Sequence, residues 1–320
     1  MVKIGYTMMC EQRSPRDLVN DVVLAEQAGF DFSVISDHYH PWVEAQGHAG
    51  FAWSILGAAA QATEKIGLMT YVTCPLIRYH PALVAQMAAT VSLLSDGRFR
   101  LGLGSGEALN EHVVGQEYPA VDIRHEMLEE SVEIIRELFG GDYVTYRGVH
   151  FDVEGAKLFD CPPTPPEIGI AAGGPQACSI AGQLGDILIT TEPNAEFVQG
   201  FVAAGGEGKP VVGQASVCWG LDEAACRALA HEQFAWSLGG WKIQSELPNC
   251  VNFEAYTRVV SEDQVAEAIP CGPDTNKIVE TVKKFADGGF TELALNHVGP
   301  DQAAFCDYFA RELGPALRKI

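Results

Sequence analysis

The chain has 320 residues, 47% of them hydrophobic, and its 42 acidic against 21 basic residues give a net charge of −21. This length and apolar content suffice for a large core, while so acidic a surface repels nucleic-acid phosphates and anionic membranes. The odd number of cysteines, nine, includes no C-x-x-C pair, which is typical of reduced thiols in the cytoplasm. No apolar run reaches the roughly 18 residues of a membrane helix, and the N-terminus leads directly into a strand. We therefore expect a cytoplasmic protein that binds a small molecule and binds neither nucleic acid nor a membrane.

Strands and helices alternate along the first hundred residues. Ser14-Pro15 provides a helix N-cap with proline at the first helical position, and Gly29 ends that helix. The predicted strands are 2–7, 30–36, 66–73 and 99–103, and the predicted helices are 14–29, 50–63 and 81–94. This alternation predicts parallel strands joined by right-handed crossovers.

The second part of the chain continues the pattern with two interruptions. We predict strands 168–172, 186–191, 211–219 and 292–296, with helices at 121–139, 175–184, between 191 and 211, from about 222, at 274–287 and at 302–313. A hairpin of 143–146 and 149–153 turns at Arg147-Gly148, and 239–260 is predicted to be irregular. The eight main strands indicate one (β/α)8 TIM-barrel domain over 1–320, an α/β fold with insertions at about 107–166 and 239–273. A doubly wound sheet is the alternative, but nothing marks a reversal of strand order.

Two strand ends carry residues capable of acid–base chemistry. Strand 30–36 leads into Asp37, His38 and Trp42, and strand 99–103 leads into Gly104-Ser105-Gly106-Glu107. Because catalytic groups of barrels lie where strands run out into loops, we expect His38 and Glu107 to converge at one rim and exchange protons. The alternatives are a solvated loop with one structural tryptophan, and a carboxylate that only favours a helix N-terminus.

Glycines and histidines suggest further ligand sites. Gly102-x-Gly104-x-Gly106 is not a dinucleotide fingerprint, because its third glycine comes one residue early and no acidic residue ends a following strand. Gly173-Gly174-Pro175 opens a helix and predicts an anion site, with a plain tight turn as the alternative. His38-x-His40 lacks an obvious third ligand, so we expect no metal.

Several segments together resemble a known family. In this order occur Ser36-Asp37-His38-x-x-Pro41-Trp42, Thr73-Cys74-Pro75 with Arg78-Tyr79-His80-Pro81, Gly104-Ser105-Gly106-Glu107-Ala108-Leu109-Asn110-Glu111 and Ala171-Ala172-Gly173-Gly174-Pro175. They are similar to the luciferase-like (bacterial luciferase superfamily) oxidoreductases that use the deazaflavin coenzyme F420, above all to the F420-dependent glucose-6-phosphate dehydrogenases. The resemblance covers essentially the whole chain and implies a luciferase-like TIM barrel, coenzyme F420 and a homodimer.

The resemblance also implies a role for individual residues. His38 and Glu107 would handle protons beside the deazaflavin ring, and Trp42 would pack against the reacting centre. Tyr71-Val72 would carry a non-prolyl cis peptide bond that bulges against the ring. Residues in contact with the cofactor would be Asp37, His38, Tyr71, Val72, Cys74, Ser105, Gly106, Glu107 and Asn110, with Gly173, Gly174, Gln176 and Ala177 around its phosphodiester.

The substrate end departs from the sugar-phosphate enzymes. Thr191 keeps an expected threonine, but Asn194 and Glu267 stand where that family has lysines, and a carboxylate there would repel a phosphate dianion. We expect hydride transfer with a neutral or weakly charged alcohol or lactol, aldehyde or enone instead of glucose 6-phosphate. Trp42, Thr191 and Asn194 would bind this substrate, and Tyr71 would form an apolar wall together with Trp42. Arg258 or Lys277 could instead restore the lost charge. An FMN-dependent monooxygenase of the same superfamily is the alternative function. A second alternative is a non-catalytic flavin-binding barrel, but such a protein would not need the acid–base pair of His38 and Glu107.

Overall fold

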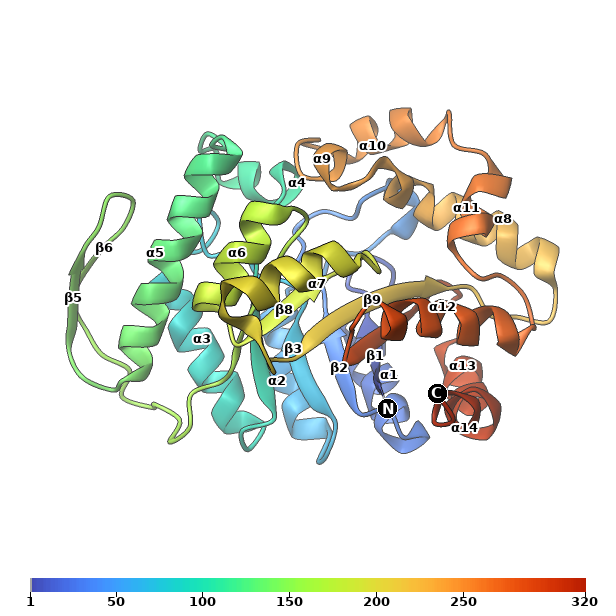
Figure 1. The fold of residues 1–320 in the computed structure, drawn as a ribbon, viewed down its shortest axis with the longest axis horizontal. Coiled ribbons are helices and arrows are strands. Elements are labelled where there is room, and N and C mark those ends of the chain that lie inside the picture. The colour runs from blue at the N-terminus through green and yellow to red at the C-terminus, as the bar shows by residue number, and fades with distance from the viewer. Residues whose placement is uncertain (1) are drawn as a thin grey trace.

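The computed structural model describes residues 2–320 and shows eight parallel strands closed into a barrel (Figure 1). Around the barrel the strands follow the order β1-β10-β9-β8-β7-β4-β3-β2. Their bounds are β1 Lys3–Met8, β2 Phe32–Ile35, β3 Gly67–Thr70, β4 Phe99–Leu103, β7 Ile168–Ala171, β8 Ile187–Thr190, β9 Val211–Val217 and β10 Glu292–His297. The predicted TIM barrel is confirmed, and the doubly wound alternative is wrong.

The helices that connect successive strands surround the barrel. They are α1 Pro15–Ala28, α2 Ala52–Ala62, α3 Pro81–Leu94, α5 Val121–Phe139, α6 Pro175–Leu184, α7 Ala195–Phe201, α8 Glu223–Phe234 and α12 Thr275–Asp287, and the chain closes with α13 Gln302–Tyr308 and α14 Gly314–Leu317. The Ser14 hydroxyl accepts a hydrogen bond from the Asp17 amide, and Gly29 ends α1 at a φ of 89°. Local capping therefore sets the bounds of α1 as the sequence predicts.

The inside of the barrel contains a small apolar cluster of its own. Phe32, Val34, Met69, Ile187, Ile189, Val212 and Ala294 form it. Below them, at the amino ends of the strands, Arg100 pairs with Glu292 at 2.7 Å and Lys3 pairs with the same carboxylate at 3.2 Å. Because side chains alternate along a strand, the inward positions beyond the cluster face the carboxyl-end rim. That rim is where a barrel binds its ligands.

Two excursions leave the barrel. The first contains α4 (Ala108–Glu111), α5 and the antiparallel pair β5 (Val144–Arg147) and β6 (Asp152–Ala156), which stands at the edge of the molecule beside α5 in Figure 1. The second contains α9 (Trp241–Gln244), α10 (Cys250–Thr257) and α11 (Glu262–Ala268), and α9 and α10 lie at the top of the same view near α4. The Ala108 amide donates to the Ser245 carbonyl at 2.9 Å, so the two excursions meet at the rim.

Two local predictions are wrong. The stretch 239–260 is not irregular, because α9 and α10 form there, and Phe253 of α10 is fully buried. The hairpin turns later than expected, so that β6 begins at Asp152 and not at Val149. The carboxylate of Glu130 on α5 accepts the backbone amides of Val149, His150 and Phe151, which draws the turn onto the helix.

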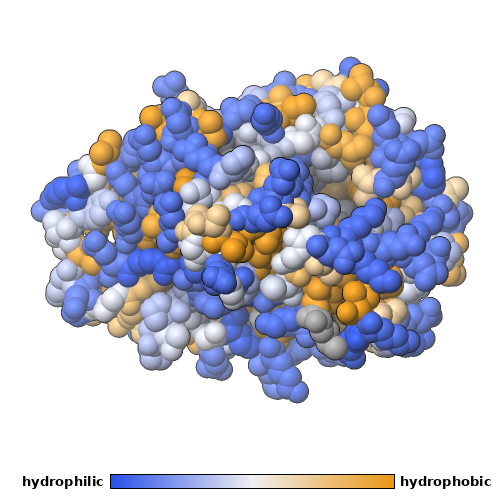
Figure 2. Space-filling view, viewed as in Figure 1, coloured by the Kyte–Doolittle hydropathy of each residue, from blue (hydrophilic) through white to orange (hydrophobic). Residues whose placement is uncertain are grey.

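Most of the surface seen in Figure 2 is hydrophilic, with separate apolar patches, as the acidic composition leads one to expect. Within residues 2–320, no helix combines the length and apolar character needed to cross a bilayer.

Candidate active site

A buried ion pair lies at the rim between the ends of β1 and β2. The His38 Nδ1 is 3.0 Å from Glu11 Oε1, and the two side chains are 8% and 0% exposed. Burial lowers the pKa of His38, but the adjacent Glu11 carboxylate outweighs burial and raises that pKa from 6.5 to about 9. At neutral pH His38 is therefore an imidazolium, able to donate a proton.

The chain holds Glu11 in the ionised state needed for this pairing. Burial raises its pKa, but His38 and a 2.6 Å hydrogen bond from the Ser36 hydroxyl leave that pKa below its ordinary value. The Ser36 hydroxyl in turn accepts the Cys10 amide at 3.1 Å. Successive polar residues at two strand ends thus place one carboxylate against one imidazole.

Asp37, next to His38, belongs to a separate network of hydrogen bonds. Its carboxylate accepts hydrogen bonds from the Thr73 hydroxyl at 2.7 Å and the Tyr79 hydroxyl at 3.2 Å, and it lies 3.3 Å from the Arg78 guanidinium. The Trp53 indole also donates to it, at 3.3 Å. The expected contact between Asp37 and the cofactor stays a prediction, and the geometry gives Asp37 a role in holding the rim together.

Glu111 completes that network on the far side of Arg78. It accepts the Arg78 amide at 2.9 Å and lies 3.5 Å from the Arg78 Nε. Burial raises the pKa of Glu111 to about 7, against the opposing effect of Arg78. A buried guanidinium thus lies between two buried carboxyl groups directly behind the His38 loop.

Glu107 and Asn110 follow β4 and approach the same loop. The Asn110 carbonyl oxygen accepts the backbone amides of Tyr39 and His40 at 2.9 and 3.3 Å, and the Asn110 amide donates to Glu107 at 3.3 Å. Asn110 therefore ties the loop that carries His38 to the segment that carries Glu107. The predicted convergence of β2 and β4 at one rim is present in the structure.

Trp42 forms one wall of the site. Its ring centre is 4.8 Å from that of His38, and its ring stacks on Trp236 at 4.1 Å with 9° between the planes. Phe253 of α10 contacts Trp42 edge-on at 5.1 Å. The turn after α8, which carries Trp236, and α10, which carries Phe253, thus supply aromatic rings around Trp42 on the His38 side of the barrel mouth.

The segment after β3 contains the expected non-prolyl cis peptide bond between Tyr71 and Val72. The Tyr71 hydroxyl donates to the Thr190 carbonyl at 3.2 Å, and Val72 packs against the apolar cluster inside the barrel. Gly104 comes so close to Val72 that a Cβ there would lie 2.6 Å from a Val72 methyl group. Two strand ends therefore narrow the mouth on this side.

Gly106 has a φ of 80°, and a Cβ on it would lie 2.6 Å from the Cys74 sulfur. Its carbonyl accepts the Tyr118 hydroxyl at 2.7 Å. Burial raises the pKa of Cys74, so its sulfur is a neutral thiol. Ser105 lies between these closely packed glycines. Glycine is required at 106 on two counts, the left-handed backbone and the adjacent thiol.

The predicted anion site lies on another side of the same rim, where the carboxyl end of β7 leads into α6. Gly174 caps α6 without a side-chain partner, and a Cβ on it would meet nothing within 4 Å. The backbone amides of Gln176 and Ala177 lie in the first turn, which points free N–H groups and the positive end of the helix outward. Trp241 of α9 lies against Gly173, where a Cβ would be 2.6 Å from its ring.

The residues expected at the substrate end lie at the end of β8. Thr191 is the first residue after β8 and is exposed at the carboxyl end of the strand. Asn194 caps α7 by accepting the Glu196 amide at 2.9 Å, a role that needs no ligand. Glu267 is exposed on α11, and Lys277 pairs with Glu223 at 2.8 Å.

Sequence reasoning missed several contributors to this site. Glu11, three residues beyond β1, follows the same strand-end rule that singled out His38, and that rule could have found it. Arg78 and Glu111 lay within quoted motifs, but no role was inferred for them. Trp236 carried no positional signal, because its stacking partner is nearly two hundred residues away in the sequence.

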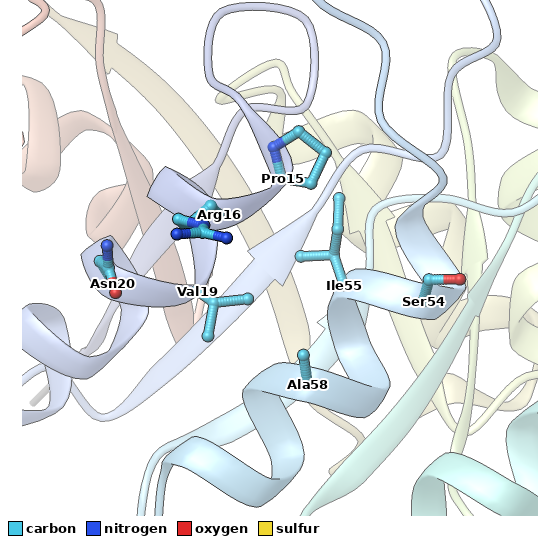
Figure 3. A pocket seen from close by; sticks show the side chains of 7 residues that line it. All are labelled: Pro15, Arg16, Val19, Asn20, Ser54, Ile55 and Ala58. Atoms are coloured by element: carbon cyan, nitrogen blue, oxygen red, sulfur yellow. The ribbon is translucent and has the colours of Figure 1, made fainter.

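A shallow groove elsewhere is unrelated to this site. It lies between α1 and α2 on the outside of the barrel, and it is lined by Pro15, Arg16 and Val19 of α1 and by Ile55 and Ala58 of α2 (Figure 3). It contains none of the predicted site residues.

Comparison with known proteins identifies the family. The model of the luciferase-like monooxygenases matches residues 2–292. The chain belongs to this luciferase-like family. Among its relatives, an F420-dependent glucose-6-phosphate dehydrogenase of Amycolatopsis mediterranei is 36% identical over the whole of both chains. A protein of the same description from Rhodococcus erythropolis is 35% identical, over 100% of this chain and 98% of its own.

Solved structures agree with the family. An F420-dependent secondary alcohol dehydrogenase in complex with an F420–acetone adduct superposes with a TM-score of 0.92 and 29% identity, over 99% of both chains. An F420-dependent tetrahydromethanopterin reductase from Methanopyrus kandleri, at 20% identity and a TM-score of 0.78, shares the luciferase-like fold. The resemblance stated from the sequence motifs is confirmed.

Proposed function

We propose that this luciferase-like protein is an F420-dependent oxidoreductase that transfers a hydride between the deazaflavin and the carbinol or carbonyl carbon of a neutral substrate. Oxidoreductase activity and the cofactor follow from relatives that match over the whole chain. The proton-handling part of the proposal rests on one observation, the buried Glu11–His38 pair beside Trp42.

The residues present fit the cofactor. Free backbone amides at the start of α6 and the open space over Gly174 suit a phosphodiester. The barrel mouth is narrow beside Gly104 and Gly106, and these two glycines add no side chain to it. When bound, the deazaflavin supplies the carbon that accepts or gives the hydride. The assignments of Ser105, Gly106, Asn110, Gly173, Gly174, Gln176 and Ala177 to its binding are part of this proposal.

The chain's own residues would handle the proton. In the reducing direction the His38 imidazolium donates a proton to the substrate carbonyl oxygen as the carbon gains a hydride. In the oxidising direction neutral His38 removes the hydroxyl proton as the hydride leaves the carbon. Trp42 and Trp236 keep water from this point, and Glu107, held by Asn110, is the second proton-exchanging group.

Local charge supports a substrate without a phosphate group. Four carboxyl groups, those of Glu11, Asp37, Glu107 and Glu111, lie at this part of the rim, and the cations that pair with them are Arg78 and His38. Both cations are already engaged, so a dianion would meet an unfavourable field. A neutral alcohol, lactol, aldehyde or enone meets no such barrier. The secondary alcohol dehydrogenase among the structural relatives supports this substrate class.

Cofactor titration tests the proposal most directly. We expect F420 to bind the purified protein much more tightly than FMN, measured by fluorescence quenching. Equal or tighter binding of FMN would favour the monooxygenase alternative. Glu107→Gln and His38→Ala should leave F420 binding nearly intact and lower turnover by roughly a hundredfold or more. Normal turnover in either variant would remove that residue from the mechanism.

Substrate and assembly need separate measurements. A panel of sugar phosphates and neutral alcohols, followed by deazaflavin absorbance, should show oxidation of the alcohols. Efficient, salt-sensitive oxidation of a sugar phosphate would contradict the charge argument.

The homodimer is proposed on the family resemblance alone, and light scattering in solution tests it.

A further inference from the structure

One buried amide at the barrel mouth has an end without a protein partner. Asn296 lies at the end of β10, is 1% exposed, and donates from Nδ2 to the Ser216 hydroxyl at 3.3 Å. Its Oδ1 has no hydrogen-bond partner within the described chain. Turning the amide over would only exchange the two ends, so one of them stays unpaired in either orientation. Such a group costs free energy unless a ligand uses it.

Strand alternation places this amide inside the barrel, on the ligand side of the apolar cluster. Ala294 on β10 and Val212 on β9 belong to that cluster, so Asn296 and Ser216, two and four residues further on, face the same way. Gln214 lies on β9 between Val212 and Ser216, and its side-chain amide donates to the Thr7 hydroxyl of β1 at 3.1 Å. The floor of the mouth on the β1, β9 and β10 side is thus polar and uncharged.

This floor lies across the barrel from the expected position of the ring. In the closed order of strands, β3 and β9 are four steps apart in either direction, so the Tyr71–Val72 bulge faces Gln214 and Ser216 across the axis. A flat ring resting against Val72 would turn its free side toward them. His38 follows β2, which is two strands from β10, and at roughly 4.8 Å per strand the backbone positions of Asn296 and His38 are about 10 Å apart along the rim.

We propose that Asn296 and Ser216 form a hydroxyl-binding subsite for the substrate. The free end of the amide and the Ser216 hydroxyl would bind a hydroxyl group remote from the carbon that exchanges the hydride. This makes the enzyme selective for a polyhydroxylated neutral substrate, such as an unphosphorylated polyol or sugar, over a plain hydrocarbon alcohol. The inference rests on the proposed function and specifies its substrate.

The test compares molecules that differ only in added hydroxyl groups. Propan-2-ol and glycerol are compared as substrates for oxidation, and acetone and dihydroxyacetone are compared as ligands of the F420-bound protein by saturation-transfer NMR. We expect the wild type to favour the hydroxylated member of each pair by roughly tenfold, the scale of one neutral hydrogen bond. Asn296→Leu should abolish the preference by raising KM for glycerol, and Ser216→Ala should reduce the preference.

Gln302 provides a matched control. It is also a buried amide, but it accepts from the Tyr6 hydroxyl at 2.9 Å and donates to the His297 and Gly299 carbonyls at 2.9 and 2.7 Å. Gln302→Leu should lower the melting temperature and leave the preference intact. Asn296→Leu should remove the preference without lowering the melting temperature, because it replaces an unpaired polar group by an apolar one of similar size.

Three results would overturn the subsite. They are a wild type that shows no preference for the hydroxylated member, a preference that survives in Asn296→Leu, and a loss of F420 affinity in that variant, which would assign the amide to the cofactor. Failure of the proposed function would be recognised separately, because the wild type would then not bind F420.

Discussion

Replacing Glu11 by glutamine should convert His38 from a charged to a neutral group at working pH. The carboxylate at 3.0 Å is what raises the pKa of His38 from 6.5 to about 9 against the effect of burial. That shift corresponds to on the order of 3 kcal/mol of stabilisation of the imidazolium. Without the Glu11 carboxylate, burial is the largest remaining influence, and Arg78 lowers the pKa of His38 further while Glu107 raises it. The pKa of His38 should therefore fall below 6.5, a change of more than two units.

The change in protonation predicts a change in rate. At pH 8 a group with a pKa of about 9 is mostly protonated, whereas one with a pKa of 6.5 is only about 3% protonated, so the rate of carbonyl reduction should fall roughly thirtyfold. In the wild type, alcohol oxidation should rise with pH through about 9, and in Glu11→Gln this limb should move to lower pH. Imidazole NMR titration, assigned with His38→Ala, measures the pKa directly, and deazaflavin absorbance measures both rates.

The same pair predicts how stability depends on pH. The folded-state pKa of His38 is raised, so its contribution is fully present below 6.5 and is lost as the pH rises through about 9. The folded-state pKa of Glu11 is lowered, so on the acid side the contribution is lost as the pH falls below 4.5. The difference in unfolding free energy between wild type and Glu11→Gln should therefore be largest near pH 5.5 and vanish above about pH 9.

Glu111→Gln is the matched control, since it removes another buried rim carboxyl group that bonds to Arg78 and not to His38. It should leave the pKa of His38 within about half a unit of the wild-type value. If His38 still titrates near 9 in Glu11→Gln, the ion pair does not set its charge and the proton-donor role has lost its basis.

Two other pairs of variants test the walls of the site. Trp236→Ala removes the ring that stacks on Trp42 at 4.1 Å, and it should raise KM and lower the unfolding free energy by about 3 kcal/mol. Trp219→Ala breaks a comparable stack, with Tyr308 at 4.4 Å, and should lower the unfolding free energy without raising KM. Denaturation measures the stability of each variant, and steady-state kinetics measures KM. Gly106→Ala and Gly115→Ala both place alanine at positive φ, at a cost of about 1 kcal/mol of stability. Only Gly106→Ala also drives a methyl group into the Cys74 thiol, so only this variant should weaken F420 binding in a fluorescence titration. Equal effects of the two variants on F420 binding would show that the cofactor does not pass Gly106.

Local chemistry explains which parts of the fold could be predicted. Helices α3 and α5 and strand β4 have the bounds expected from the sequence, because proline at the start of α3 and apolar periodicity act within one element. Helices α9 and α10 were missed because they are short, and segments of that length are stabilised by tertiary contacts. For α10 that contact is Phe253 beneath Trp42. The hairpin register was missed for a similar reason, since Glu130 on another element determines where it turns.

The candidate site divides in the same way. His38 and Glu107 could be found because each follows a strand, and every parallel strand of a barrel ends at the same rim. The partner of His38 could not be deduced from that rule alone, because the rule does not say which strand ends are neighbours. Only the closed order, in which β1 lies between β2 and β10, brings Glu11 to His38 and Asn296 to the adjacent part of the floor.

The expectation of an uncharged substrate stays a prediction, and the structure changes the reason for it. From the sequence it rested on Asn194 and Glu267 standing where relatives have lysines. In the structure Asn194 is a helix cap and Glu267 is exposed on α11, so neither is held in place to repel a ligand. The repulsion comes instead from carboxylates that serve the chemistry itself, above all Glu11, whose negative charge keeps His38 protonated. A lysine restored at 267 would therefore not be enough to make the site accept a phosphate, because the group that opposes the dianion is the same one that prepares the proton donor.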